Sequence, residues 1–422
     1  MLSIIGEGRN NTECEGDNRS MDINKARILY ISKYYYPFLG GTEQVARDMV
    51  KALIGTGAKQ KVICFNEDAS DGKTICKHGE TRTDVIDDVD IIRCGYLLKA
   101  RSQAVSDTYG RELKKVMDEF KPNIIILHYP NPFATHYLMK YKDRDFKLLV
   151  YWHLDITKQK VLKHLFHGQN LALIERADKI LGATPKHVDE SAFTPQFGDK
   201  RYILPYMIDE SNLQITEEEI RAGEQIKEKY QGKTLGFFIG RHVPYKGLTY
   251  LIKASKELGD ANMHFLVAGS GELTEGLKEE AKGDPKVEFL GRITHSDRRS
   301  YLYACDIILF PSITRNEGFG LALAEGMYFG HPAVTFTIPG SGVNFVNLDG
   351  VTGIECPNCD YKAYAEALKK LNDNKNLRDE MGKSARKRVL DNFTEDSFRN
   401  GMRQLIQELK PMQVGGGTAK IK

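Results

Sequence analysis

The chain lacks several features that define whole classes of protein. None of its apolar runs approaches the ~20 residues that a helix needs to cross a bilayer. Its first 25 residues contain neither the hydrophobic segment nor the cleavage site of a secretory signal, so we expect a cytoplasmic protein. The net charge of +3 is too small to favour nucleic acid as a partner. With 41% hydrophobic and 28% charged residues, the composition is that of an ordinary globular protein.

Disulfide chemistry is disfavoured as well. Seven cysteines, an odd number in a chain of 422 residues, indicate reduced thiols rather than a disulfide framework. Cys356-Pro-Asn-Cys359 has the spacing of a redox or zinc pair, but no second pair accompanies it. We interpret it as a loop between a short strand and the helix that follows.

Short apolar runs recur along the chain in two series, with helical patterns between them. The runs lie at 28–31, 62–65, 124–127, 148–150 and 180–181, and then near 235–239, 264–268, 287–290, 306–310 and 333–336. Short apolar runs that alternate with helices are typical of parallel strands buried on both faces. The sequence therefore predicts an α/β protein with two doubly wound sheets, each with a carboxyl edge suited to ligands.

The segment Glu317-Gly-Phe-Gly-Leu-Ala-Leu-Ala-Glu325 is the most informative part of the chain. It follows the run 306–310, so Glu317 lies near the carboxyl end of a predicted strand. Gly318 and Gly320 let backbone N–H groups approach a ligand, and the N-terminus of the next helix favours anions. Amides for phosphate and carboxylates for hydroxyls predict a nucleotide-activated sugar as the ligand. The alternative is an amphipathic helix with two surface glutamates.

A second loop supports the ligand interpretation. Gly240-Arg241-His-Val-Pro-Tyr-Lys246-Gly247 follows the predicted strand at 235–239. Arg241 and Lys246 are thereby placed on a strand-to-helix connection, where cations neutralise phosphate.

In this order, the motifs resemble those of the retaining glycosyltransferases of family 4, which have the GT-B fold. The resemblance covers roughly residues 26–410 and rests on an ordered series: Gly40-Gly41-Thr42-Glu43, Gly240-Arg241 to Lys246-Gly247, Gly269-Ser-Gly271-Glu272, Gly291-Arg292-Ile293, Pro311-Ser312, Glu317 to Glu325 and Gly340-Ser-Gly342-Val343. Two positions depart from the family pattern. Gly326 replaces the usual Ala, and the stretch 204–209 lacks a common Asn-Gly pair.

The resemblance implies the domain organisation. Residues 25–205 form a Rossmann-like domain on the acceptor side, residues 206–393 form one that binds the nucleotide sugar, and the two face each other across a cleft. The final helix, about 394–411, crosses back onto the first domain. Residues 1–24 are polar, and we expect them to form a disordered tail.

The resemblance also assigns roles to residues. Glu317 binds hydroxyls of the transferred sugar and Glu325 binds the ribose, while Arg241 and Lys246 stabilise the charge that develops on the leaving diphosphate. The other expected donor contacts are Gly40, Gly41, Gly271, Arg292, Ile293, Gly318, Phe319 and Gly320. His153, at the end of a buried strand, is expected to contact the sugar near the reacting carbon. His128 and Asp155 are candidates for the acceptor pocket, although a satisfied structural histidine is the alternative for both histidines.

The expected reaction moves a hexosyl unit from a GDP- or UDP-sugar to a saccharide or polyprenyl-linked saccharide, in cell-envelope polysaccharide synthesis at the inner face of the membrane. We expect no cofactor and no metal, because two cations and a helix end already offset the diphosphate charge. Asp88-Val-Asp90 has the composition of a metal-binding pair, but it precedes a predicted strand in the first half and we discount it. A sugar-nucleotide 2-epimerase and a non-catalytic sugar-nucleotide-binding subunit are the alternatives.

Overall fold

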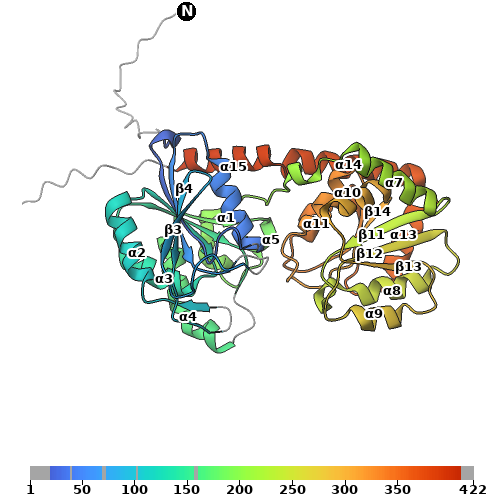
Figure 1. Ribbon diagram of the computed structural model, residues 1–422, viewed down its shortest axis with the longest axis horizontal. Helices are drawn as coiled ribbons and strands as arrows, with labels where there is room; N and C mark the ends of the chain where they lie inside the picture. Colours follow the sequence, from blue (N-terminus) through green and yellow to red (C-terminus); the bar gives the residue numbers. More distant parts are fainter. Residues whose placement is uncertain (1–19, 39, 69–72, 101–102, 156–159, 410–422) are drawn as a thin grey trace, which may run out of the picture.

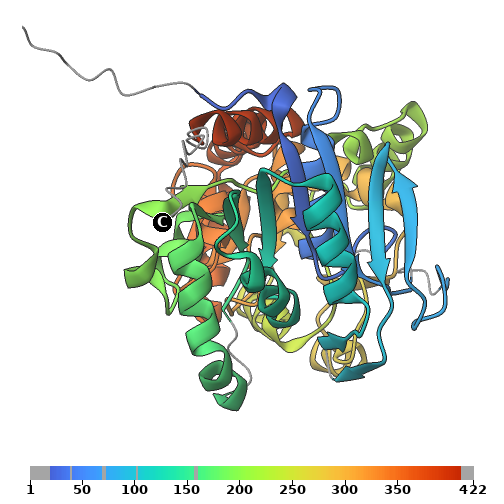
Figure 2. The same ribbon diagram turned by 90° about the vertical axis from the view of Figure 1, so that its left-hand side faces the viewer.

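Two α/β domains lie side by side in the computed structural model, which describes residues 20–38, 40–68, 73–100, 103–155 and 160–409 (Figure 1). Figure 2 shows the sheet of the N-terminal domain in front of the C-terminal domain. Within the described ranges, no helix combines the length and the apolar character that crossing a membrane requires.

The N-terminal domain is built on an eight-stranded sheet in the order β10-β9-β8-β7-β1-β2-β4-β3. Its strands are β1 (Arg27–Ile31), β2 (Lys59–Phe65), β3 (Arg82–Ile86), β4 (Val89–Cys94), β7 (Ile124–Tyr129), β8 (Lys147–Trp152), β9 (Lys179–Gly182) and β10 (Arg201–Ile203), and a separate hairpin joins β5 (Leu98–Ala100) to β6 (Gln103–Val105). All neighbours in the large sheet are parallel except β3 and β4, which form an antiparallel hairpin at its edge.

Helices cover both faces of this sheet. They are α1 (Gly41–Ala52), α2 (Tyr109–Lys115), α3 (Pro132–Leu138), α4 (Lys160–Arg176), α5 (Pro185–Asp189) and α6 (Thr194–Phe197), with short turns η1 (Ile23–Lys25), η2 (Val116–Phe120), η3 (Met139–Tyr141) and η4 (Gly198–Lys200). Val45, Met49 and Ala52 share the buried side of α1, as their spacing requires.

The C-terminal domain has a six-stranded parallel sheet in the order β13-β12-β11-β14-β15-β16. Its strands are β11 (Thr234–Ile239), β12 (Met263–Ala268), β13 (Val287–Gly291), β14 (Ile307–Phe310), β15 (Ala333–Phe336) and β16 (Gly353–Cys356). Its helices are α7 (Glu217–Lys229), α8 (Leu248–Glu257), α9 (Thr274–Glu280), α10 (His295–Ala304), α11 (Leu321–Tyr328), α12 (Val343–Val346), α13 (Tyr361–Asp373) and α14 (Lys375–Asn392), with the turn η6 (Pro244–Lys246). The apolar runs predicted to be strands are strands in both domains.

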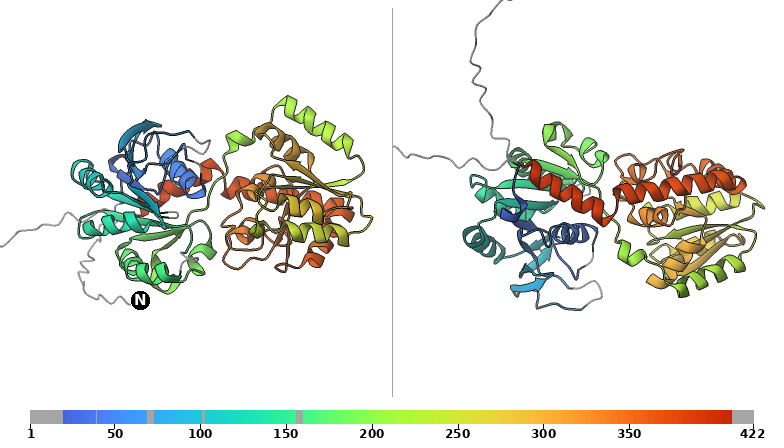
Figure 3. Two further views of the ribbon diagram at one scale, coloured as in Figure 1. Left: turned by 60° about the horizontal axis from the view of Figure 1, so that its bottom comes forward. Right: turned by 90° about the horizontal axis from the view of Figure 1, so that it is seen from above.

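The chain passes between the domains twice. The first passage leaves β10 and reaches the C-terminal domain through η5 (Glu210–Leu213). The second occurs at Phe393 and Thr394, where α14 ends on the C-terminal domain and α15 (Glu395–Glu408) begins its path along the N-terminal domain (Figure 3, right). The two passages are adjacent, because the Ile208 N–H donates to the Phe393 carbonyl at 2.8 Å.

The expected N-terminal tail is only partly described. Residues 1–19 lie outside the described residues. Met21, however, is buried, and its N–H donates to the carbonyl of Gln407 in α15 at 3.4 Å. Asp22 caps η1 by accepting from the Asn24 N–H. Residues 20–24 therefore pack against the N-terminal domain instead of belonging to the tail.

The glycine at position 326 has a physical explanation in the packing of α11 on β14. A Cβ atom at this position would lie 2.5 Å from the side chain of Ile308. The branched side chain of Ile308 therefore occupies the space that alanine would need, and only glycine lets the helix approach the strand so closely.

Gly326→Ala should accordingly lower the free energy of unfolding by about 1–3 kcal/mol, as overpacking does in tight cores. Combining it with Ile308→Ala should cost less than the sum of the two single changes, which chemical denaturation of the four proteins would measure. Gly276→Ala in α9 is the matched control, because nothing lies within 4 Å of a Cβ there. If Gly276→Ala destabilised the protein as much as Gly326→Ala, contact with Ile308 would not be the cause.

Candidate functional site

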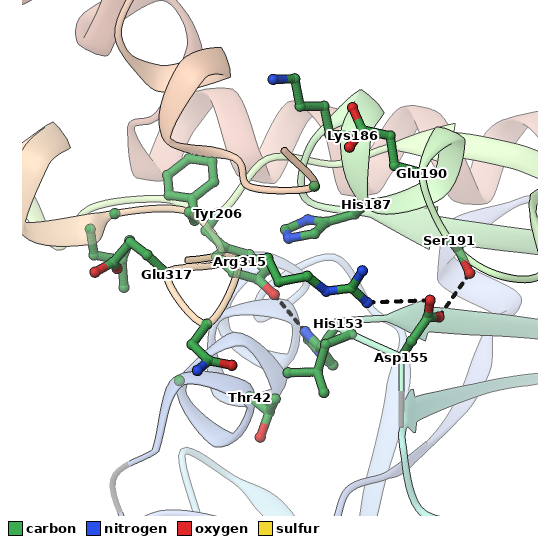
Figure 4. A pocket seen from close by; sticks show the side chains of 18 of the residues that line it. Thr42, His153, Asp155, Lys186, His187, Glu190, Ser191, Tyr206, Arg315 and Glu317 are labelled. Atoms are coloured by element: carbon green, nitrogen blue, oxygen red, sulfur yellow. Dashed lines mark hydrogen bonds and ion pairs between the residues drawn. The ribbon is translucent and has the colours of Figure 1, made fainter. Parts of the chain in front are cut away.

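A cavity of about 380 Å³ lies between the two domains. Its N-terminal wall comes from the ends of β8 and β9 and the start of α1, and its C-terminal wall from the loops after β11 and β14 (Figure 4). Its lining includes Gly41, Thr42, His153, Asp155, His187, Tyr206, Lys246, Arg315, Glu317, Gly318, Phe319 and Gly320. The carboxyl edges of the two sheets therefore face each other, and one cavity collects predicted site residues from both.

The Glu-Gly-Phe-Gly turn forms much of the C-terminal wall. Gly320 caps α11 with φ at 89°, a left-handed conformation that glycine adopts without strain. The Gly318 carbonyl accepts from the Gly342 N–H at 2.7 Å, and a Cβ on Gly342 would lie 2.4 Å from that carbonyl oxygen. The turn is thereby fixed from behind, and the N-terminus of α11 opens into the cavity as an anion site.

Lys246 and Glu317, two of the four predicted catalytic residues, form an ion pair with each other. Both side chains are about nine-tenths buried, at 10% and 12% exposure. The hydroxyl of Ser312 donates to the same Glu317 oxygen at 3.1 Å, and the Lys246 ammonium lies 5.2 Å from the centre of the Phe310 ring. The predicted cation for phosphate and the predicted acid for sugar hydroxyls are therefore neighbours at the cavity wall.

Glu325, the predicted ribose ligand, is paired in another way. It follows Glu317 into α11, and its carboxylate accepts from Arg298 of α10 at 3.0 Å. Burial raises the pKa of Glu325, while Arg298 acts in the opposite direction. Arg298 was not anticipated, because only the packing of α10 beside α11 brings it to this carboxylate.

Glu325 lines neither cavity, whereas a further group of predicted residues lines a second cavity, of about 650 Å³, at the carboxyl ends of β11, β12 and β13. It is lined by Arg241, Gly271, Arg292 and Ile293, among others. Glycine is required here by close backbone contact: a Cβ at Gly271 would lie 2.4 Å from the His242 carbonyl oxygen. Arg292 Nε donates to the Ser270 hydroxyl at 2.8 Å, which holds the guanidinium at the cavity edge.

The two cavities adjoin at Lys246. An added Cβ on Gly240, which lines the second cavity, would stand 3.5 Å from Cε of Lys246, which lines the first. Lys246 therefore lies between the two cavities, with Arg292 in the wall of one and His153 in the wall of the other.

His153 lies directly after β8, at the strand end that the sequence predicted, and it lines the wall of the cleft. Its Nε2 is 3.0 Å from Nδ1 of His128, and its Nδ1 is 2.6 Å from the hydroxyl of Tyr206. Burial lowers the pKa of His128 to about 3 and holds the pKa of His153 well below its usual value. Both imidazoles are therefore neutral at pH 7 and act as hydrogen-bonding groups rather than cations.

Asp155, a predicted acceptor residue, is held by protein groups. Its carboxylate accepts from Trp152 Nε1 and the Ser191 hydroxyl, both at 2.8 Å, and from the Ala192 N–H at 2.9 Å. Arg315 of the C-terminal domain lies 3.5 Å away and completes an ion pair across the cleft (Figure 4). These contacts favour a structural role for Asp155, in which it organises one wall and ties it to the other domain.

Of the two glycines in the Gly40-Gly41 motif, only Gly41 lines the cavity. Gly41 and Thr42 line the cavity at the start of α1. Gly40 caps the helix in an extended conformation, and a Cβ there would meet the carboxylate of Glu43 at 2.2 Å. Glu43 is buried, which raises the pKa of its carboxyl group. Gly40 therefore leaves room for Glu43, and Gly41 is the glycine that a ligand is able to reach.

The carboxylates considered as possible metal ligands lie outside the cleft cavity. Asp88 is in the turn between β3 and β4, and Asp90 is paired with Lys61. Within the described ranges, one group of possible metal ligands was found, namely Glu67, Asp68 and His78. None of these residues lines the cleft cavity.

Sequence comparisons match the two domains to two related family descriptions. "Glycosyltransferase Family 4" matches residues 39–192, and "Glycosyl transferases group 1" matches residues 219–388. The O-antigen chain mannosyltransferase C of Escherichia coli is 27% identical over 373 residues, which cover 88% of this chain and 95% of the relative. The D-rhamnosyltransferase WbpZ of Pseudomonas aeruginosa is also 27% identical, over 87% of this chain and 92% of the relative.

Solved structures share the fold at lower identity. Sucrose-phosphate synthase from Thermosynechococcus elongatus superposes with a TM-score of 0.70 at 19% identity, over 90% of this chain and 98% of that one. Anabaena HepE in complex with UDP superposes with a TM-score of 0.69 at 15% identity, over 91% and 100%. The matched families, the full-length relatives and the paired sheets agree: the chain belongs to glycosyltransferase family 4, has the GT-B fold and is a glycosyltransferase.

Proposed function

We propose that this chain is a retaining glycosyltransferase. It transfers a hexosyl unit from a GDP- or UDP-sugar to a hydroxyl group of a saccharide or lipid-linked saccharide. The observation that carries the proposal is the meeting of two cavities at Lys246, with Arg241 and Arg292 on one side and Glu317 and His153 on the other. Both parts of a sugar nucleotide then have a place, and the diphosphate lies between them.

The chemistry of the walls fits the three parts of such a donor. The base belongs beside Arg292 and Ile293, the ribose at Glu325, and the diphosphate between Arg241, Lys246 and the N-terminus of α11. The sugar then lies between Glu317 of one domain and His153 of the other. Cations and a helix end stabilise charge where it develops on the leaving diphosphate, which is usually the largest contribution to such catalysis.

Retention follows from attack on the face that the diphosphate leaves. The bond from the acceptor oxygen to the anomeric carbon forms as the bond from that carbon to the phosphate oxygen breaks, and the leaving phosphate takes the acceptor proton. Glycosidase-like catalysis would need two carboxylates placed around the anomeric carbon. In the cavity, Glu317 is paired with Lys246, and Asp155 accepts from Trp152, Ser191 and Ala192, so we assign neither of these carboxylates as a nucleophile.

The acceptor class is inferred from the relatives. The names of the two full-length relatives describe transfer of mannose to an O-antigen chain and transfer of D-rhamnose. We therefore propose an envelope polysaccharide or its lipid-linked precursor as the acceptor, reached from the cytoplasmic side of the membrane.

Donor binding must also rearrange the Lys246–Glu317 pair. A diphosphate oxygen offers Lys246 a second anion, and a sugar hydroxyl offers Glu317 a donor, so neither buried charge loses its partner when the ligand enters. A buried charge without a partner is costly, whereas an exchange of partners is not. The pair thus keeps both groups in position before the donor arrives.

Transfer should survive removal of divalent metals. Candidate GDP- and UDP-hexoses would be tested with and without EDTA, and the anomeric configuration of the product determined by NMR. We expect the same rate in EDTA and a product with the configuration of the donor, because protein cations offset the diphosphate charge. Loss of activity in EDTA with recovery in Mn²⁺ would refute metal independence, and an inverted product would refute retention.

Substitution of the two glutamates should affect the binding of different parts of the donor. Glu325→Gln should weaken binding of the free nucleoside diphosphate by about 1.5–3 kcal/mol, the value of a hydrogen bond to a charged group. Glu317→Gln should leave that binding nearly unchanged and impair the intact sugar nucleotide and turnover. Calorimetric titration with diphosphate and with sugar nucleotide would measure both. The opposite pattern would exchange the two assignments.

The Lys246–Glu317 pair should also contribute to the free energy of unfolding of the ligand-free protein. Lys246→Met or Glu317→Gln alone should lower the free energy of unfolding by up to about 3 kcal/mol, because each leaves a buried charge alone. The double variant should recover most of that loss, as denaturant titration would show. Lys278→Met is the control, because its pair with Glu275 is exposed. Additive single effects would mean that the two charges are not coupled.

A further inference from the structure

Tyr206 connects the two halves of the active site. It lies on the passage from β10 to η5, and its ring centre is 5.2 Å from that of Phe319 in the C-terminal donor turn. On the other side it is 5.9 Å from the ring of His153 and 5.8 Å from that of Tyr151. Tyr206 thus contacts both cavity walls and belongs to the first of the two passages of the chain between the domains.

The hydroxyl of Tyr206 completes a chain of hydrogen bonds through His153. It lies 2.6 Å from His153 Nδ1, while His128 Nδ1 lies 3.0 Å from His153 Nε2. The rings of His128, His153 and Tyr151 are nearly parallel, with interplanar angles of 6–13°. His153 therefore has a partner at each nitrogen and a stacked ring on its face, so its ring position is fixed before any ligand binds.

The protonation pattern of the chain follows from the chemistry of its groups. A neutral imidazole has one N–H donor and one acceptor nitrogen. A phenol O–H is a better donor than an imidazole N–H, so Tyr206 donates to Nδ1 of His153. The proton of His153 then sits on Nε2, which donates to Nδ1 of His128, and the proton of His128 sits on its buried Nε2, which has no hydrogen-bond partner among the described residues. A change at Tyr206 thus changes which nitrogen of His153 carries the proton.

On these contacts, and resting on the proposed function, we propose that Tyr206 is a positioning residue of the active site. Its hydroxyl sets the tautomer and ring orientation of His153, and its ring aligns His153 with the Glu-Gly-Phe-Gly turn that faces it. Position 206 falls in the stretch 204–209, where the family pattern has a common Asn-Gly pair.

Tyr206→Phe tests the proposal, because it keeps the ring on Phe319 and removes only the hydroxyl. We expect kcat to fall roughly 10- to 100-fold, the range for a slight misplacement at a reacting centre. The affinity for free GDP or UDP should stay within about 2-fold, because Tyr206 lies on the sugar side. Tyr202→Phe is the matched control: it is a half-buried tyrosine on β10 whose hydroxyl donates to the Gly401 carbonyl, and kcat should not change. Equal kcat in wild type and Tyr206→Phe would overturn the proposal.

Nitrogen-15 NMR of histidine-labelled protein gives a second readout that needs no turnover. The His153 signals are those that a His153→Asn variant lacks. In the wild type we expect protonated Nε2 and a hydrogen-bonded, unprotonated Nδ1. In Tyr206→Phe we expect a mixture of tautomers. An unchanged spectrum would refute positioning by Tyr206 even if no sugar nucleotide were turned over, whereas absent turnover with the expected spectra would count only against the proposed function.

Discussion

Packing of α15 on the N-terminal domain is the interaction on which the site depends. Phe398, Met402, Leu405 and Ile406 bury one side of this helix. Each such side chain contributes about 1.5–3 kcal/mol when it is fully removed from water. Because α15 follows directly from α14 of the other domain, this apolar contact holds the two sheets with their carboxyl edges facing. Without it, the distance between the walls of the cleft would depend on the passage through residues 204–209 and on the contacts across the cleft, such as those between Asp155 and Arg315 and between Tyr206 and Phe319.

Three acids at the site have a cation beside them. Glu317 is paired with Lys246, Glu325 with Arg298, and Asp155 with Arg315. Burying one charge without the other would cost several kcal/mol, so the pairs make a polar cleft compatible with a stable fold. The Asp155–Arg315 pair has a second effect, because its members come from different domains and their attraction draws the cleft together.

His153 and His187 in the N-terminal wall, and His128 buried beside His153, contribute hydrogen bonds instead of charge. Burial keeps His128 and His153 neutral, and it lowers the pKa of His187 to about 4. A wall of neutral imidazoles does not compete with Lys246 for the diphosphate. It presents donors and acceptors whose directions are set by neighbours such as Tyr206, which suits the recognition of sugar hydroxyls.

The sequence by itself determined the two sheets, the position of Glu317 at a strand end and the loop that carries Lys246. The spacing of apolar residues, the length of apolar runs and the positions of glycines are local properties of the chain. These features can therefore be predicted without knowing the tertiary packing. It also placed His153 at a strand end, but not its bonds to His128 and Tyr206. The antiparallel hairpin of β3 and β4, the packing of Met21 and the ion pairs of Glu325 and Asp155 were decided by tertiary structure. Each depends on residues distant in the chain, as do the contacts of Tyr206 with His153 and Phe319. A sequence pattern fixes what a segment is able to form, whereas the partner of a buried polar group is chosen by whichever segment packs against it.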